Sequence, residues 1–275
     1  MFDPRPTKYP FPEYTDEHYL KVKKNDGVVF DADYPYVDDS PAFMRKRRLF
    51  EVVLRLIVFP LTRIRLGLKV EGRDNLKKYA DELKNGAVLC ANHVHLWDFL
   101  AIRSALLPHK PYVLIWAPNI NGENGKNMRL IGGIPVPETG PAATSAQLRD
   151  IERTLNKGDW LQIYSEGSMW EFYQPIRPFK RGAAYIARRF SKPLLPMAFS
   201  YREPGWIRKH IFRQTALFTL HIGTPLYADP SLSGKSADED LCIRSHEAVC
   251  RLAGIDPAEN IYPPLFNKTR RVDYY

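Results

Sequence analysis

Apolar residues recur along the chain with two different spacings, which separate predicted strands from predicted helices. Short apolar runs that are typical of strands cover residues 87–91, 111–117, 134–136, 160–164, 194–200 and 216–223. Stretches with helical spacing cover residues 142–156, 181–190 and 237–253. Because short strands that alternate with helices build parallel sheets, the pattern predicts an α/β fold. We expect a mostly parallel central sheet flanked by helices.

The segment from Phe43 to Leu68 has a pattern of its own. It opens with the basic run Arg45-Lys46-Arg47-Arg48. Apolar residues then follow at helical spacing, at Leu49, Phe50, Val53, Leu56 and Ile57. Arg48 and Arg55 share the other face, and Pro60 is expected to bend or divide the helix.

Two interpretations of this segment stay open. It can be an ordinary amphipathic helix that packs on the core. It can also be an interfacial helix whose apolar face enters lipid while its basic cluster meets anionic headgroups. The four basic residues beside so many Leu, Val and Ile side chains favour the second interpretation.

These patterns predict four segments. Residues 1–41, rich in Pro, Tyr and Asp, form an extended N-terminal arm, and residues 42–68 form the basic, membrane-interfacial helical element. Residues 69–230 form the α/β domain, and residues 231–275 form a helical C-terminal extension. No secretion signal opens the sequence, and no run reaches the roughly 18 apolar residues of a spanning helix. We therefore expect a peripheral or monotopic protein on the cytoplasmic face of a membrane.

The composition narrows the classes of partner and compartment. The chain has 40 Lys and Arg against 31 Asp and Glu, a net charge of +9 that suits solubility, an anionic membrane surface or an anionic substrate. Nucleic acid is not an expected partner, because the aromatic residues lie in the arm and in apolar strands rather than within a basic patch. The three cysteines form no CxxC pair, which indicates a reducing compartment.

Polar clusters follow two of the predicted strands directly. Residues 87–91 lead into Asn92–Asp98, and residues 160–164 lead into Ser165–Ser168. Ligand sites in α/β sheets lie beyond the carboxyl ends of the strands. If the two strands are parallel, both clusters therefore lie at one edge of the sheet.

His93 and Asp98 are the first candidates for chemistry. On one helix they would point about 140° apart, so they can meet only where His93 precedes the helix and Asp98 lies in its first turn. A carboxylate on one ring nitrogen fixes the tautomer and leaves the other nitrogen as a base. Spacing alone slightly favours the alternative, a helix cap in which the two side chains merely bond one another.

Several motifs in order resemble those of one family. Asn92-His93-x4-Asp98 is similar to the first motif of the glycerolipid acyltransferases, the family of 1-acylglycerol-3-phosphate acyltransferase. Tyr164-Ser165-Glu166-Gly167-Ser168 resembles its third motif, usually Phe-Pro-Glu-Gly-Thr-Arg. Leu130–Val136 stands where the second motif is expected, and Leu194–Ala198 resembles the fourth motif. Phe179–Ala183 and His221–Pro225 resemble further segments of the family. The resemblance covers roughly residues 70–227.

The resemblance implies a site and a reaction. His93 would be the general base and Asp98 its orienting partner. Substrate-binding roles would fall to Asn92, Glu166, Gly167, Ser168, Lys180 and Arg181. The donor would be acyl-CoA or acyl-carrier protein, and the acceptor lysophosphatidic acid or a related lyso-lipid in phospholipid biosynthesis. No cofactor, no metal and no covalent enzyme intermediate would be needed.

Two departures from the family pattern concern the acceptor. Arginines are expected at the end of the second motif and after Gly-Thr in the third, but Pro137-Glu138 and Ser168-Met169 stand there. Guanidinium groups bind phosphate well. Either Arg129, Arg177, Lys180 or Arg181 replaces them, or the acceptor has no phosphate.

Three alternatives use the same residues differently. The protein can keep the acyltransferase fold with a non-phosphate acceptor, or only bind lipid. A metal-dependent hydrolase would use His93, His95 and Asp98 as ligands, although the Asp spacing differs from HxHxD. Cys90 is interpreted as a buried structural cysteine rather than a nucleophile.

Overall fold

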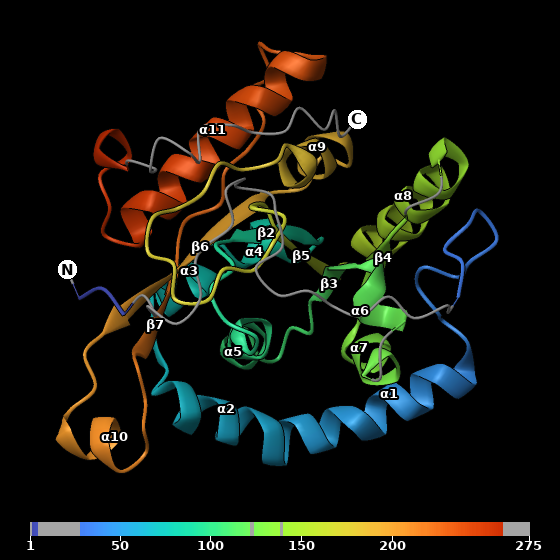
Figure 1. Ribbon diagram of the computed structural model, residues 1–275. Coiled ribbons are helices and arrows are strands. Elements are labelled where there is room, and N and C mark those ends of the chain that lie inside the picture. Colours follow the sequence, from blue (N-terminus) through green and yellow to red (C-terminus); the bar gives the residue numbers. More distant parts are fainter. Residues whose placement is uncertain (1, 5–27, 122–123, 138–139, 261–275) are drawn as a thin grey trace.

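A central sheet organises the molecule (Figure 1). The computed structural model describes residues 2–4, 28–121, 124–137 and 140–260. Within them one sheet has the strand order β1-β7-β6-β2-β5-β3-β4. The strands are β1 (Lys69–Glu71), β2 (Ala87–Ala91), β3 (Tyr112–Trp116), β4 (Gly133–Val136), β5 (Trp160–Tyr164), β6 (Leu194–Arg202) and β7 (Leu217–Ile222). The five neighbouring strands β6, β2, β5, β3 and β4 are parallel to one another. Strand β7 runs antiparallel to β6, and β1 pairs with β7 in parallel. The predicted α/β class with a mostly parallel sheet is confirmed.

Helices cover the sheet on both faces. The α-helices are α1 (Pro41–Val53), α2 (Phe59–Leu66), α3 (Arg73–Lys78), α4 (Ala80–Leu83), α5 (Asp98–Ala105), α6 (Ala117–Asn121), α7 (Gly125–Ile131), α8 (Gly140–Asn156), α9 (Gly182–Arg189), α10 (Trp206–His210) and α11 (Gly234–Leu252). A π-helical segment, η1 (Leu54–Val58), joins α1 to α2, and a 3₁₀ turn, η2 (Pro257–Glu259), follows α11. The three predicted helices match α8, α9 and α11. The short helices α3, α4, α6, α7 and α10 were not predicted, because a helix of one or two turns is too short to show the helical period.

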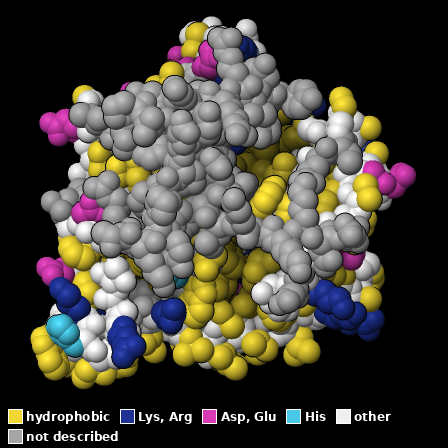
Figure 2. Space-filling view, in the orientation of Figure 1, with side chains coloured by type: hydrophobic (Ala, Val, Ile, Leu, Met, Phe, Trp, Pro, Cys, Tyr) yellow, Lys and Arg dark blue, Asp and Glu magenta, His cyan; other side chains and the backbone are white. Residues whose placement is uncertain are grey.

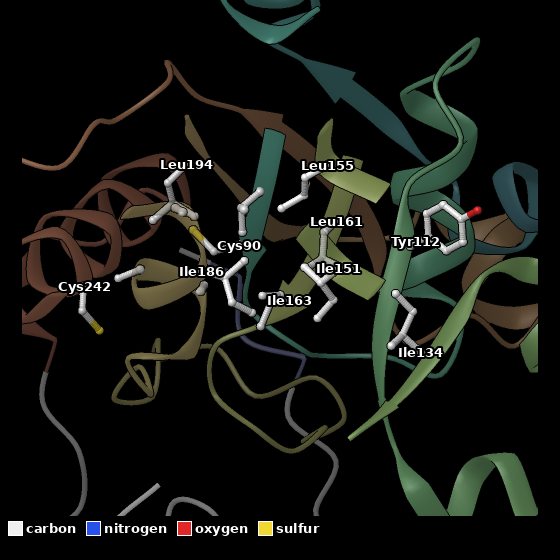
Figure 3. Close-up of a cluster of buried hydrophobic side chains, with 14 of the residues drawn as sticks. Cys90, Tyr112, Ile134, Ile151, Leu155, Leu161, Ile163, Ile186, Leu194 and Cys242 are labelled. Atoms are coloured by element: carbon white, nitrogen blue, oxygen red, sulfur yellow. The ribbon is translucent and has the colours of Figure 1, made fainter. Parts of the chain in front are cut away.

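Alternation along the strands divides the core into two layers. In β2, Val88 and Cys90 point to the face covered by α8, α9 and α11, a cluster shown in Figure 3. Leu89 and Ala91 point to the opposite face, where α4 and α5 pack. Every residue of β2 is buried, as expected for a central strand with helices on both sides. Because β2 is fixed on both faces, the loop after it starts from a rigid position.

The segment 41–66 forms one continuous curved helix along an edge of the molecule (Figure 1). Pro60 does not divide it. Pro60 has no backbone N–H and so cannot donate to the turn before it. That turn, η1, takes the wider π-helical geometry, in which the Phe59 N–H donates to the Leu54 carbonyl. Leu54 and Phe59 pack with Leu100 of α5 and Ile131 of α7. The helix therefore contacts the element that begins at Asp98.

The inner face of this helix carries charge, while apolar side chains point outward. Glu51 is buried and accepts a hydrogen bond from Arg103 at 2.8 Å, and Arg47 is buried against the Tyr112 hydroxyl. Leu56 is 73% exposed. The other exposed apolar side chains of the helix are Leu49, Val52, Val53, Ile57, Leu61 and Ile64. An ordinary surface helix has the opposite arrangement.

The described part of the N-terminal arm packs on the domain. Tyr36 and Val37 are buried, and Arg129 of α7 donates hydrogen bonds to the carbonyls of Pro35 and Tyr36. Residues 1 and 5–27 of the predicted arm lie outside the described residues. At the other end, α11 packs against β6 and α9. The predicted segment boundaries stay a prediction.

Candidate functional site

The loop after β2 brings His93 to Asp98. Ala91 of β2 lies in register with Tyr164 of the parallel strand β5, so the two polar clusters emerge side by side. His93 lies in this loop and Asp98 is the first residue of α5, the arrangement the spacing required. The His93 Nδ1 atom lies 2.7 Å from Asp98 Oδ2. The His93 side chain is 22% exposed while that of Asp98 is fully buried, so the ring has one edge accessible.

Four donors converge on the Asp98 carboxylate. Oδ2 accepts from the backbone N–H groups of Val94 at 3.0 Å and His95 at 3.2 Å, besides the His93 ring. Oδ1 accepts from the Tyr164 hydroxyl at 2.5 Å. A carboxylate with these partners is an acceptor, which assigns the proton to His93 Nδ1 and the lone pair to Nε2. The arrangement provides a base aimed away from its buried carboxylate.

Tyr164 contributes a second contact beside its hydrogen bond. Its ring stacks on the His93 imidazole, with centroids 3.8 Å apart and planes at 11°. Burial raises the pKa of the Tyr164 phenol well above its ordinary value, and the nearby Asp98 carboxylate raises it further. The phenol therefore stays protonated and donates. Stacking and hydrogen bonding together hold both members of the pair.

Glu166 acts on the same loop from the other side. Its Oε2 accepts from the His93 backbone N–H at 2.9 Å and from Arg177 Nη2 at 2.8 Å. Its Oε1 accepts from the Arg177 backbone N–H at 2.9 Å. Glu166 and Arg177 are both buried. These contacts fix the position of His93, and the predicted substrate-binding role of Glu166 stays a prediction.

Asn92 and Ser168, two further predicted binding residues, are also buried. The Asn92 amide donates to the Phe199 carbonyl at 3.1 Å and accepts from the Phe199 N–H at 2.8 Å, which ties the end of β2 to β6. The Ser168 hydroxyl accepts from Arg177 Nη1 at 2.6 Å. Both side chains therefore support the loops that carry the site.

Gly167, Lys180 and Arg181 lie nearer the surface. Gly167 has φ +78°, a left-handed conformation that suits glycine, and a β-carbon there would lie only 2.8 Å from the Lys180 side chain. The Lys180 side chain thus lies directly over the Glu166–Gly167 turn. Arg181 instead points to α11, where it pairs with Glu239 at 3.5 Å.

His95 does not share the surroundings of His93. Its Nδ1 accepts from the Trp97 backbone N–H at 3.0 Å, and its ring packs against Phe218 and Phe172. Burial lowers the pKa of His95 to about 4, so the ring is neutral. Among the described residues, no three His, Cys, Asp or Glu side chains gather as a metal ion requires. The geometry therefore lends nothing to the metal-hydrolase alternative.

A comparison with protein families bears on the part of the chain that contains this site. Residues 67–200 match the family model described as Acyltransferase. The chain carries an acyltransferase-family domain. The match confirms the resemblance drawn from the ordered motifs, and it includes the predicted pair together with Glu166, Gly167 and Lys180 of the acyltransferase domain.

The sequence was also compared with curated proteins, and the structure with solved structures. No curated protein matches the sequence. Among solved structures, the chain is similar to the 1-acyl-sn-glycerophosphate (LPA) acyltransferase PlsC from Thermotoga maritima. The identity is 20% and the TM-score 0.48, with 79% of this chain and 88% of that chain covered.

Two residues of the acyltransferase domain site were not assigned these roles from the sequence. Tyr164 stands where the family motif usually has Phe, so an extra hydroxyl beside the site was visible as a departure. Arg177 was considered only as a phosphate ligand. Its pairing with Glu166 depends on how the loop after β5 folds back, which no local pattern encodes.

We expect Tyr164→Phe to lower kcat for acyl transfer about tenfold, because a hydrogen bond to a charged group is worth roughly 1.5–3 kcal/mol. KM for donor and acceptor should change little, since the ring that stacks on His93 is kept. Steady-state kinetics would measure both parameters.

Tyr227→Phe is the matched control, because Tyr227 also donates to a carboxylate, that of the exposed Glu82, away from the site. It should keep wild-type kcat. Equal kcat in Tyr164→Phe and the wild type would show that the phenol does not position Asp98.

Proposed function

We propose that the protein is an O-acyltransferase that moves a fatty acyl group from an acyl thioester to a hydroxyl of a lyso-lipid. The donor is acyl-CoA or acyl-carrier protein. The observation that carries the proposal is the His93–Asp98 pair, 2.7 Å apart with one ring edge accessible, inside an acyltransferase-family domain. No separate cofactor is needed for this chemistry.

The chemistry requires one base that also returns a proton. His93 Nε2 takes the proton from the acceptor hydroxyl as its oxygen attacks the thioester carbonyl carbon. Asp98 stabilises the imidazolium that forms. The tetrahedral intermediate then collapses, the C–S bond breaks, and the thiolate leaving group takes the proton from the imidazolium. The products are the new ester and the free thiol, and the enzyme is unchanged.

The acceptor is the finer part of the proposal. Of the cations considered as substitutes for the missing motif arginines, Arg129 donates to backbone carbonyls, and Arg177 is buried with Glu166. Arg181 pairs with Glu239. The Lys180 side chain lies over Gly167. The residue before Gly167, Glu166, accepts a hydrogen bond from the His93 backbone N–H. Because the Lys180 side chain lies next to the loop that carries His93, we favour a lyso-lipid with an anionic headgroup, with lysophosphatidic acid as the first acceptor to test, and Lys180 as the headgroup ligand.

The helix of residues 41–66 supports action at a membrane. Its outer face is apolar, and the basic side chains of Arg45, Lys46 and Arg48 are exposed at its start. Such a helix lies in an interface with its apolar face in lipid and its cations on anionic headgroups. Among the described residues, no helix is long and apolar enough to cross a bilayer. We propose peripheral or monotopic binding on the cytoplasmic face.

His93→Ala should reduce thiol release from acyl-CoA at least about a hundredfold in the presence of lysophosphatidic acid, since general-base catalysis is typically worth 10²–10⁴-fold. Release of the thiol can be followed with a chromogenic thiol reagent. His109→Ala, which removes a histidine stacked on Trp160 away from the pair, is the control and should keep activity.

Undiminished turnover in His93→Ala would contradict the proposed role of His93 as the general base. Acyl-lipid binding without turnover by the wild-type protein, whatever the acceptor, would support the lipid-binding alternative instead.

Lys180→Gln should raise KM for lysophosphatidic acid about tenfold and leave KM for monoacylglycerol unchanged, because the substitution removes only the charge that meets a phosphate. Lys180→Arg should restore most of the affinity. Lys235→Gln, at an exposed position on α11, serves as the control for net charge. The same KM change for both acceptors would exclude Lys180 as a headgroup ligand.

A further inference from the structure

The excursion between β6 and β7 exposes an unusual number of large apolar side chains. The strands pair up to Arg202 and Leu217, and the chain between them projects from the sheet as α10 and its flanking turns. Trp206 is 69% exposed and Phe212 is 67% exposed. Ile207 and Ile211 are exposed beside them. Such a group on one short segment points to a binding surface rather than to a core.

Polar contacts fix this excursion to the end of α2. The last carbonyl groups of a helix have no partner within it. Here the Ile64 carbonyl accepts from Arg208 at 3.1 Å and from Gln214 at 3.3 Å, and the Arg65 carbonyl also accepts from Gln214. Arg202 donates to the carbonyl of Gly67, which follows α2. The excursion and α2 are therefore held as one unit.

The apolar surfaces of α2 and α10 are continuous. Between them lies a groove of about 540 Å³. Its lining includes Ile64 of α2 with Trp206, Ile207 and Phe212 of the excursion. Figure 2 shows hydrophobic side chains along this edge of the molecule, with Lys and Arg on both sides of them.

The charge around this surface selects its partner. Residues 41–66 contain seven Lys or Arg and residues 203–216 contain three, against one Glu in each segment. The exposed cations of the excursion include Lys209 and Arg213. A large apolar surface bordered by cations matches a bilayer with anionic headgroups, which offers acyl chains and negative charge together.

The catalytic loop lies next to this surface. The Arg65 guanidinium lies over the Trp97 ring, 5.0 Å from its centroid, and Trp97 directly precedes Asp98. Leu96 in the same loop is exposed. A membrane in contact with α2 and α10 therefore lies beside the loop that carries His93.

We propose that the β6–β7 excursion is a second membrane-inserting element, which enters an anionic bilayer together with the outer face of α2 and sets the orientation of the His93 loop. The inference rests on the proposed action at a membrane surface. One inserted helix allows the protein to roll about the helix axis. A second contact beside the end of that helix removes this freedom and fixes which side of the site faces lipid.

The test measures binding to vesicles without acyl donor or acceptor. The variant Trp206→Ser/Phe212→Ser should lose about tenfold or more in affinity for vesicles of phosphatidylcholine mixed with phosphatidylglycerol, because two large apolar side chains no longer enter lipid. Ile243→Ser/Leu232→Ser, two exposed apolar residues in and before α11, is the matched control and should bind as the wild type does. Thermal unfolding confirms that each variant is folded.

A second measurement locates the excursion directly. Brominated lipid should quench tryptophan fluorescence of the wild-type protein, and part of that quenching should vanish in Trp206→Phe. Lys209→Gln/Arg213→Gln should reduce the preference for anionic over neutral vesicles.

The outcomes separate this inference from the proposed function. If the wild type binds vesicles and Trp206→Ser/Phe212→Ser binds equally well, the second element is refuted while membrane action stands. If the wild type binds no vesicles, the proposed membrane action itself fails. A dimer that forms without vesicles and is lost in the same variant would replace the bilayer by a second copy of the chain, and would also overturn the proposal.

Discussion

The site depends on one buried carboxylate. Asp98 lies at the start of α5 and accepts from the His93 ring, two backbone N–H groups of the same loop and the Tyr164 hydroxyl. A buried carboxylate without partners would be strongly destabilising, so the chain around it must supply donors. That requirement fixes the loop after β2 and joins it to the end of β5. The same bonds that satisfy the charge also orient the imidazole.

A second buried charge supports the first. The Oε2 atom of Glu166 accepts hydrogen bonds from Arg177 Nη2 and from the backbone N–H of His93. The two carboxylates thus hold His93 from both ends, Asp98 at its ring and Glu166 at its backbone. Rigid placement of a base before substrate arrives is what positioned catalysis needs. Glu166, for which a substrate-binding role stays a prediction, thus also holds the backbone of His93.

Much of this arrangement could be predicted from local patterns. The apolar runs of β2 and β5 marked two buried strands, and their parallel register placed the His93 and Glu166 clusters together. The order of motifs then favoured the interpretation of His93 and Asp98 as a general base and its orienting partner over a helix cap. Arg177 could not be paired with Glu166 in this way, because its partner lies across a loop without periodicity.

The helix of residues 41–66 is a second case in which local patterns predict an element but not its contacts. Its period predicted an amphipathic helix but not which apolar residues pack and which face outward. Leu54 is buried against α5 and α7 while Leu56, two residues on, is exposed. Tertiary packing decides that choice. The excursion at α10 has no periodicity at all, so only the folded chain places Trp206 beside Ile64.

The central claim is that Asp98 holds His93 with its proton on Nδ1 and its lone pair on Nε2. Nitrogen-15 NMR of the histidine side chains, with His93→Gln used to assign the signal, tests this directly. For the neutral imidazole the account predicts that His93 Nδ1 carries the proton and Nε2 is unprotonated, and that Asp98→Asn removes this preference. A proton on Nε2 in the wild-type protein would contradict the account.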